Sequence, residues 1–422
     1  MESFTKLGIT DEIAKAAKNK GFENPTKIQE KTIPIILKGQ DVLAGSKTGS
    51  GKTFAFGAGI LQRLEKQNYP FALVLVPTRE LAEQVGREIK SFSNIKKVNV
   101  TMVYGGVSMN PQIESLRTTD IIVATPGRLL DHHRQRTVNL SQIQMLVLDE
   151  ADRMLDMGFI DDIEQIMKQT PKTRQTLLYT ATLRPELLRI ASKYMNDPKE
   201  IQVEQHVSKD KLKQVYYDVR NHQKMSFLVH LLKNEDSDLS MVFCNTRHQV
   251  DLVANILKDQ GLKVLALHGG LTQNKRTQVM KMFDDTGKSK ILVCTDVSAR
   301  GIHIDNVSHV YNFDVPRDPK EYTHRIGRTA RAEKEGLVIN ILSQNDHGNF
   351  GRVQQENRSY DIKKVPLPEF KQLDIDIRSN IKNMRKKGGG FRQKSFSKNR
   401  NAPQSSSAPK RKFFKPRNKM KR

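Results

Sequence analysis

The sequence has few cysteines, no long apolar run and, toward its end, no acidic residues. Its two cysteines, Cys244 and Cys294, lie in separate apolar runs and form no pattern of paired spacings, so neither a disulfide framework nor a zinc site is expected. We predict that both are buried structural thiols. Neither the first residues nor any later run is apolar for long enough to serve as a signal peptide or a membrane span. We therefore expect a soluble, cytoplasmic protein with no membrane partner.

The absence of acidic residues is confined to the last part of the chain. Residues 381–422 contain sixteen Lys or Arg and no Asp or Glu, which leaves +9 of the formal net charge of +25 for residues 1–380. No amphipathic apolar face or lipidation signal accompanies this charge, so nucleic acid is the expected partner. Phe391, Phe396, Phe413 and Phe414 are interleaved with the basic residues, and their rings can stack on bases. The alternative is a solvated tail that only aids solubility.

The clearest motif that is present is a Gly-rich turn after a short apolar run. Residues 41–44 predict a buried strand, and the turn that follows comprises Ser46, Lys47, Thr48, Gly49, Ser50, Gly51, Lys52 and Thr53. A strand, a Gly-rich turn and a helix start are typical of a phosphate-binding loop, in which backbone N–H groups bind a polyphosphate. Lys52 would meet the outer phosphates and Thr53 would hold a magnesium ion. The alternative is a plain turn between a strand and a helix.

The length and the apolar rhythm predict the fold. A chain of 422 residues is too long for one ordinary core, so two domains and a tail are expected. Short Val-, Ile- and Leu-rich runs alternate with helical segments on both sides of a polar stretch, which predicts an α/β protein with doubly wound parallel sheets. We expect domains at residues 1–204 and 214–368, a linker at 205–213 and a disordered basic tail at 369–422.

The ends of the predicted strands carry the candidate chemistry, because ligands collect at the carboxyl ends of parallel strands. Asp149 and Glu150 follow one run; the first carboxylate could hold magnesium and the second could deprotonate the attacking water. The alternative is an N-cap and a first-turn charge for the next helix. Arg328 and Arg331 would share a face if helical and could bind one phosphate cluster. Paired arginines on a solvated face are the alternative there.

Taken in order from Phe4 to Arg331, these motifs resemble those of the DEAD-box ATP-dependent RNA helicases, in particular bacterial members with a short basic tail. The resemblance implies two tandem RecA-like domains and an RNA-dependent ATPase that separates short duplexes, in ribosome assembly or RNA turnover. It also implies largely sequence-independent RNA binding, a monomer, and ribosomal or RNA-turnover proteins as partners. Two alternatives stay open, namely an ATP-gated RNA clamp or scaffold with little strand separation and a DNA-directed helicase.

The resemblance also implies roles for individual residues. Phe22 and Gln29 would read adenine, and the turn at 46–53 would bind the phosphates of ATP. Mg²⁺ would be held by Thr53 and Asp149, while Arg328 and Arg331 would act as arginine fingers. Contacts that couple ATP to the two domains would come from Asp152, Thr180, Thr182 and His324. RNA would be bound by Arg79, Gly105, Gly106, Thr125, Arg128, Thr246, Gln273, Arg276, Thr295 and Asp296.

Four residues depart from the family's usual pattern. Ser46 stands where Ala is usual, Thr180 where Ser is usual and Ala330 where Gly is usual. His303 replaces an Asp whose carboxylate in the family accepts hydrogen bonds from the ribose of ATP. A neutral imidazole accepts only one hydrogen bond, so we expect a weaker or rearranged grip on the ribose and not a loss of activity.

Overall fold

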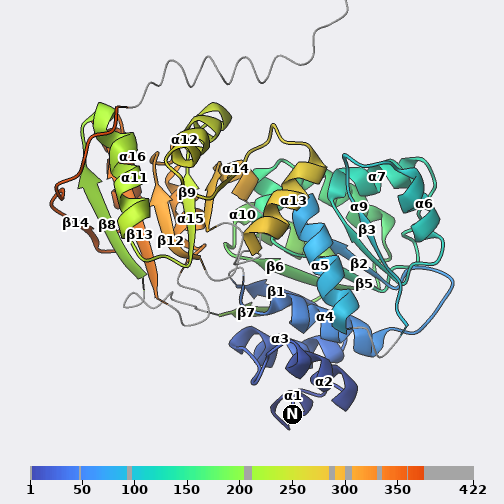
Figure 1. Ribbon diagram of the computed structural model, residues 1–422. Helices are drawn as coiled ribbons and strands as arrows, with labels where there is room; N and C mark the ends of the chain where they lie inside the picture. The colour runs from blue at the N-terminus through green and yellow to red at the C-terminus, as the bar shows by residue number, and fades with distance from the viewer. Residues whose placement is uncertain are drawn as a thin grey trace, which may run out of the picture. The chain divides into compact units, whose positions relative to one another are not determined.

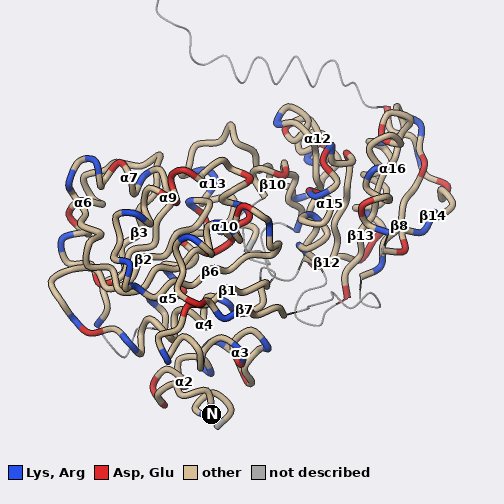
Figure 2. Tube along the Cα trace, turned by 180° about the vertical axis from the view of Figure 1, so that it is seen from behind, with Lys and Arg blue, Asp and Glu red and all other residues tan. Residues whose placement is uncertain are grey.

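The computed structural model describes residues 2–46, 49–92, 97–203, 212–284, 290–299, 307–329, 335–358 and 360–374. Several predictions fall outside the described residues. They concern Lys47, Thr48, His303, Ala330 and Arg331, most of the linker, and the tail from residue 375 onward. Lys and Arg are mixed with Asp and Glu along the described chain (Figure 2), so the single-sign charge predicted for the tail has no counterpart there.

The first half of the chain forms a parallel sheet of seven strands in the order β3-β4-β2-β5-β6-β1-β7. All of its strand pairs are parallel. The strands are β1 (Val42–Gly45), β2 (Ala72–Leu75), β3 (Val100–Val103), β4 (Ile121–Ala124), β5 (Met145–Leu148), β6 (Gln175–Thr180) and β7 (Lys199–Gln202). Strands β2, β4, β5 and β6 are buried along their whole length, as expected for a sheet with helices on both faces.

The helices of this half cover the two faces of the sheet in two groups (Figure 1). One core cluster contains apolar residues of α2 (Asp11–Asn19), α3 (Lys27–Leu37), α4 (Lys52–Arg63) and α5 (Arg79–Phe92). The other contains those of α7 (Pro126–Arg134), α8 (Ala151–Asp156), α9 (Ile160–Gln169) and α10 (Pro185–Tyr194). The short helices α1 (Glu2–Thr5) and α6 (Asn110–Leu116) complete this half.

The second half repeats the arrangement with the strand order β10-β11-β9-β12-β13-β8-β14. Its strands are β8 (Leu212–Asp218), β9 (Leu239–Phe243), β10 (Val264–Leu267), β11 (Ile291–Cys294), β12 (Val307–Asn312), β13 (Gly336–Leu342) and β14 (Ile362–Lys364). All of their pairs are parallel. The helical elements are η1 (Asn221–Gln223), α11 (Lys224–Asn234), α12 (Arg247–Asp259), α13 (Gln273–Asp284), α14 (Asp296–Ala299), α15 (Pro319–Ile326) and α16 (His347–Glu356).

The two sheets confirm the predicted α/β fold. Two edge strands, β7 and β14, were not predicted, because their residues are largely exposed and include Lys and Glu instead of a continuous apolar run. Both cysteines are buried as predicted, one in each of the two core clusters of the second half, and burial raises the pKa of both thiols. Among the described residues, none of the helices combines the length and the apolar character needed to cross a membrane.

Candidate active site

The phosphate-loop prediction falls on the connection between β1 and α4. Ser46 donates its backbone N–H to the carbonyl of Thr180 on the neighbouring strand, at 2.7 Å, and its hydroxyl lies 2.5 Å from that of Ser50. Gly51 has a φ of 89° and stands directly before the first residue of α4, Lys52. A Cβ at this position would lie 2.5 Å from Nε2 of Gln29, so both the backbone angle and the available space require glycine.

Gln29 is fully buried and is bound to the phosphate loop. Its Nε2 donates to the carbonyl of Gly51 at 3.1 Å, and its Oε1 accepts the backbone N–H of Thr26 at 2.9 Å. The hydroxyl of Thr26 donates to the carbonyl of Ser50 at 2.8 Å. This amide therefore ties the start of α3 to the turn that ends in Lys52, a contact that the sequence does not reveal.

Phe22 belongs to an aromatic cluster at the start of α4. Its ring lies 5.7 Å from that of Phe54, and Phe4 packs edge-on against Phe54 with ring centroids 5.5 Å apart. Phe4 is buried, whereas Phe22 is only partly buried. Phe4 thus supports the cluster from inside, and Phe22 presents its ring at the border of the same region.

Lys52 and Asp149 form a buried ion pair between the phosphate loop and the end of β5. Nζ of Lys52 lies 3.5 Å from Oδ1 of Asp149 and donates to the carbonyl of Ser46 at 3.3 Å. Burial raises the pKa of the Asp149 carboxyl, and the Lys52 ammonium opposes this rise. The structure therefore brings together the cation and the carboxylate that the sequence analysis assigned to phosphate and magnesium.

Glu150 follows Asp149 with a left-handed φ of 53°, a conformation uncommon for a residue other than glycine. It occupies the N-cap position of α8, but its side chain makes no capping hydrogen bond, so the alternative of a helix cap does not describe it. Its Oε2 is instead bound by Nη1 of Arg153. Burial disfavours the charge, but Arg153, Lys52 and Arg328 lower the pKa of this carboxyl to about 2.

Three of the four residues predicted to couple ATP to the domains lie together. Oδ2 of Asp152 accepts from the backbone N–H and the hydroxyl of Thr182 at 3.1 and 3.0 Å. The hydroxyl of Thr180 donates to the carbonyl of Thr182 at 2.8 Å. These bonds join the end of β6 to α8 directly beside Glu150. The fourth residue, His324, lies on α15, with Nδ1 4.0 Å from Oε2 of Glu321.

The predicted RNA-binding residues of the first half also cluster at strand ends. Gly106 has a φ of 81°, and a Cβ there would lie 1.8 Å from Nη1 of Arg79, so the Arg79 guanidinium lies against the glycine backbone. Arg128, on the first turn of α7, donates to the carbonyl of Val107 at 3.1 Å. Thr125 is the N-cap residue of the same helix. Two guanidinium groups, a hydroxyl and a glycine turn therefore meet at one edge of the sheet.

The predicted RNA-binding residues of the second half lie at three places: on α13, at the start of α12 and after β11. Gln273 and Arg276 on α13 both donate to Oε1 of Glu80, at 3.4 and 2.8 Å. Thr246 caps α12 by accepting from the N–H of Gln249 at 3.2 Å. Thr295 and Asp296 follow β11, and the hydroxyl of Thr295 contacts that of Ser298 at 3.0 Å.

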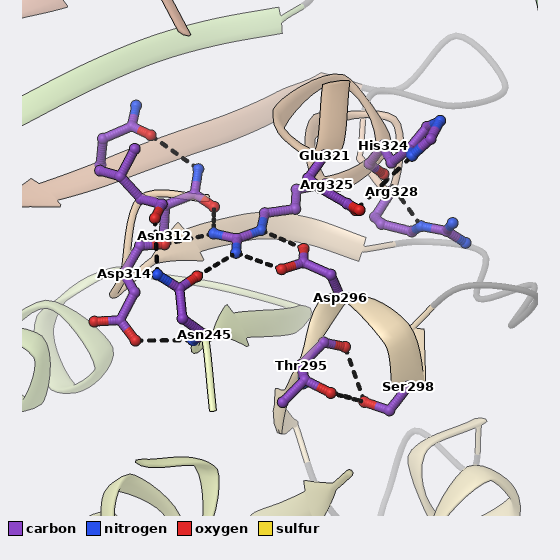
Figure 3. A network of polar contacts seen from close by, with 12 residues as sticks. Asn245, Thr295, Asp296, Ser298, Asn312, Asp314, Glu321, His324, Arg325 and Arg328 are labelled. Atoms are coloured by element: carbon purple, nitrogen blue, oxygen red, sulfur yellow. Dashed lines mark hydrogen bonds and ion pairs between the residues drawn. The ribbon is translucent and has the colours of Figure 1, made fainter. Parts of the chain in front are cut away.

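Asp296 is held by Arg325, a residue that the sequence analysis did not single out (Figure 3). Nε and Nη2 of Arg325 donate to the two carboxylate oxygens of Asp296 at 2.5 and 2.7 Å. The remaining N–H groups donate to the side chains of Asn245 and Asn312 and to the carbonyl of Asp314. All five donors are thus used, and one buried guanidinium joins the ends of β9, β11 and β12.

The condition under which Arg328 and Arg331 would share a face, a helix through both residues, is not met at Arg328. Helix α15 ends at Ile326 with Gly327 as its C-cap, so Arg328 follows the helix and does not lie on it. Its Nε donates to the carbonyl of His324 at 3.3 Å (Figure 3). Helical spacing therefore does not determine where the guanidinium group of Arg328 lies. Arg328 follows α15, the helix that carries His324, by two residues.

Known families match both halves of the chain. The model described as DEAD/DEAH box helicase matches residues 26–190, and that of the helicase conserved C-terminal domain matches residues 223–333. The ATP-dependent RNA helicase CshA of Limosilactobacillus reuteri is 42% identical over 86% of this chain and 73% of its own length. The chain belongs to the DEAD-box family of ATP-dependent RNA helicases. It is accordingly an RNA-dependent ATPase, and its substrate ATP and its nucleic-acid partner RNA follow from the family.

Other DEAD-box proteins support the same assignment. CshA of Listeria monocytogenes is 42% identical over 88% of this chain and 71% of its own length. Among solved structures, S. cerevisiae Dbp5 bound to RNA and ADP BeF3 has a TM-score of 0.77 and 31% identity, covering 92% of this chain and 99% of that one. The DEAD-box helicase Mss116 bound to ssRNA and UDP-BeF has a TM-score of 0.77 and 30% identity, covering 88% and 81%.

The residues of this helicase fit a magnesium ion held mainly by its nucleotide. Among the described residues, no group of three or more His, Cys, Asp or Glu side chains could hold a metal by itself. Thr53 is the second residue of α4, and Oδ1 of Asp149 lies 3.5 Å from Nζ of Lys52; both side chains carry oxygen, the donor type that Mg²⁺ prefers. Mg²⁺ usually keeps several waters and takes further ligands from phosphates, so two protein oxygens suffice for such a site.

Proposed function

We propose that this helicase couples ATP hydrolysis at the Lys52, Asp149 and Glu150 site to local separation of short RNA duplexes. The observation that carries the proposal is the buried pair of Lys52 and Asp149 at the end of the phosphate loop, at 3.5 Å. Beside it, Asp152 and Thr182 are joined by two hydrogen bonds. In this proposal, a movement of Asp149 and Glu150 on ATP binding or hydrolysis reaches the segment after β6 through the bonds between Asp152 and Thr182.

Each residue of the site has its own role in binding or hydrolysing ATP. Backbone N–H groups of residues 46–53 and Lys52 bind the phosphates, and Phe22 packs on the adenine while Gln29 keeps the loop in place and reads the base. Thr53 and Asp149 hold Mg²⁺, which when bound neutralises the charge of the phosphates. Glu150, kept ionised, orients the attacking water and accepts its proton. Arg328 and Arg331 stabilise the charge that develops on the transferred phosphate.

RNA is bound through its backbone in this proposal. Arg79, Arg128 and the glycine turn at 105–106 offer guanidinium groups and close backbone approach to a sugar-phosphate chain, and such contacts carry no base sequence. Thr246, Thr295, Gln273 and Arg276 add the contacts of the second half, with Asp296 held in place by Arg325. The RNA-bound forms of Dbp5 and Mss116 among the similar structures support an RNA interface on this fold.

Two further features complete the proposal. The tail from residue 369 tethers RNA without sequence preference, because its basic residues suit phosphates and the rings of Phe391, Phe396, Phe413 and Phe414 suit bases. The helicase acts as a monomer in the cytoplasm, on structured RNA in ribosome assembly or RNA turnover. The bacterial CshA relatives, which are named as ATP-dependent RNA helicases, support action on RNA.

Phosphate release in the presence of single-stranded RNA, single-stranded DNA or neither tests the proposal. RNA should stimulate release and DNA should not, and the Glu150→Gln variant should lose the stimulated rate while still binding RNA. A short tailed RNA duplex then distinguishes strand separation from an ATP-gated clamp. Hydrolysis without separation would favour the clamp, and equal stimulation by DNA would contradict the choice of RNA.

A further inference from the structure

Two side chains donate hydrogen bonds to the backbone carbonyls of the connection between β3 and α6. Residues 104–108 contain Gly105 and Gly106, and the last three of these five residues are exposed. Nε2 of Gln112, on α6, donates to the carbonyls of Tyr104 at 3.0 Å and Ser108 at 3.5 Å. Arg128 binds the carbonyl of Val107 between them. Three of the five carbonyl groups in this exposed turn are therefore fixed by two side chains.

The orientation of Gln112 depends on His132 of α7. Nε2 of His132 lies 3.2 Å from Oε1 of Gln112, and Nδ1 lies 2.8 Å from the hydroxyl of Thr137. Because the NH₂ group of Gln112 faces two carbonyls, its Oε1 must accept, and the hydrogen of the neutral imidazole is assigned to Nε2. His132 is fully buried and Gln112 nearly so. An amide that rotated by half a turn would leave buried polar groups unpaired.

The charge state of the ring agrees with this arrangement. Burial lowers the pKa of His132, nearby Arg128 lowers it further, and Asp131 opposes both. The neutral ring donates from Nε2, and its Nδ1 lies 2.8 Å from the Thr137 hydroxyl, whose single hydrogen is shared between this nitrogen and the carbonyl of His132 at 3.0 Å. His132 also lies four residues after Arg128 on the same helix, so the buried ring and the guanidinium stand on one side of α7.

We propose that His132 is a positioning residue for RNA, which acts through Gln112 to hold the Gly105 and Gly106 turn beside Arg79 and Arg128 in the shape that accepts a backbone phosphate. The inference rests on the proposed RNA contact of this turn. His132 itself touches no RNA. Its contribution is to hold, through Gln112, the carbonyls of Tyr104 and Ser108, which fixes the glycine turn against the Arg79 guanidinium.

Two substitutions at this position separate the role of Nε2 from simple packing. His132→Gln places an amide nitrogen near the position of Nε2, whereas His132→Asn places one near Nδ1 only. With wild type as reference, His132→Asn should raise the RNA concentration for half-maximal ATPase by about tenfold, the cost of roughly one or two buried hydrogen bonds. The rate at saturating RNA should stay within about twofold. His132→Gln should stay close to wild type.

Gln112→Glu supplies an independent variant, because a carboxylate cannot donate to Tyr104 and Ser108. It should raise the half-maximal RNA concentration as His132→Asn does, with the KM for ATP unchanged. Thermal unfolding of each variant shows whether it is folded at the assay temperature. Equal effects of His132→Asn and His132→Gln, or a lower rate at saturating RNA in place of weaker RNA dependence, would overturn the inference.

Arg128→Ala and Arg79→Ala distinguish this failure from failure of the proposed function. If both weaken RNA dependence while His132→Asn and Gln112→Glu do not, the turn binds RNA without the help of His132, and the inference is wrong. If neither arginine variant changes RNA dependence, the proposed RNA contact at this edge is itself wrong.

Discussion

The two sheets of this helicase carry comparable buried lysines, and only one of them follows a glycine-rich turn. Lys52 is the first residue of α4, which follows β1, and Lys224 is the first residue of α11, which follows β8. The strand orders place β1 and β8 in equivalent positions, and likewise β5 and β12. Lys52 pairs with Asp149 after β5, and Lys224 lies 3.9 Å from Asp314 after β12.

The surroundings of the two lysines differ. Lys224 donates to Asp346 at 2.7 Å and packs over the ring of Phe313, so its charge is already matched by carboxylates of its own half. The turn before it, residues 219–223, contains no glycine, whereas the turn before Lys52 contains two with left-handed backbone. Only the backbone before Lys52 therefore has the glycines that let successive N–H groups turn toward a phosphate, which is why we propose Lys52 and not Lys224 as a phosphate ligand.

Lys52→Met tests the first side of this comparison and has the largest expected effect. The variant removes the cation that meets the outer phosphates, and ATP turnover at saturating RNA should fall by about a thousandfold, the upper range for loss of one electrostatic contact to a transition state. Phosphate release measures it. Lys224→Met, assayed at a temperature where it is folded, is the matched control and should keep turnover within about threefold of wild type. A similar loss of ATP turnover in both variants would show that the two lysines do not differ in their role in hydrolysis.

Lys224→Met itself should act on stability. Removing the ammonium leaves Asp346 and Asp314 buried without their shared cation, and loss of one partner from a buried pair costs about 3–5 kcal/mol. Urea unfolding monitored by circular dichroism measures the change in the free energy of unfolding. Lys52→Met should cost less, because Lys52 serves one carboxylate at 3.5 Å, whereas Lys224 serves two, one of them at 2.7 Å. A larger loss of unfolding free energy in Lys52→Met than in Lys224→Met would contradict the structural role assigned to Lys224.

Asp346→Asn sharpens the account of Lys224 through pH, with the smallest effect. Lys224 and Ser343 lower the pKa of Asp346 below 3.8 against the effect of burial, so the charged carboxylate stabilises the fold above that value and the contribution is lost as the pH falls through the folded pKa. Wild type should therefore be more stable than Asp346→Asn at neutral pH, and the difference in unfolding free energy should shrink below pH 3.8. A difference independent of pH would show that the carboxylate charge is not involved.

Prediction from the sequence succeeded where the signal was local. The fully buried strands β2, β4 and β5 are continuous apolar runs, and Gly51 and Lys52 are adjacent in the chain. The sequence could not show that Gln29 binds Gly51, because that bond joins residues 22 positions apart and depends on how α3 packs. Lys224 and Asp346 are separated by 122 positions. Contacts between distant strand ends follow from the sheet order, which local patterns do not specify.

Arg325 shows a second limit. It lies between His324, which the resemblance assigns to domain coupling, and Arg328, which it assigns to the phosphate of ATP. Nothing in the local pattern distinguishes a guanidinium aimed inward from one aimed at a ligand. The structure shows that it is almost fully buried and bound to Asp296. The sequence therefore did not reveal that Arg325, within the segment from His324 to Arg328, joins strand ends of the second sheet.

The central claim is that, of the two equivalent lysines, only Lys52 belongs to an ATP site. Equilibrium titration of the protein with a fluorescent ATP analogue, in the presence of Mg²⁺ and RNA, tests it most directly. The account predicts one nucleotide per chain, with binding lost in Lys52→Met and kept in folded Lys224→Met. Two nucleotides per chain, or undiminished binding by Lys52→Met, would contradict it.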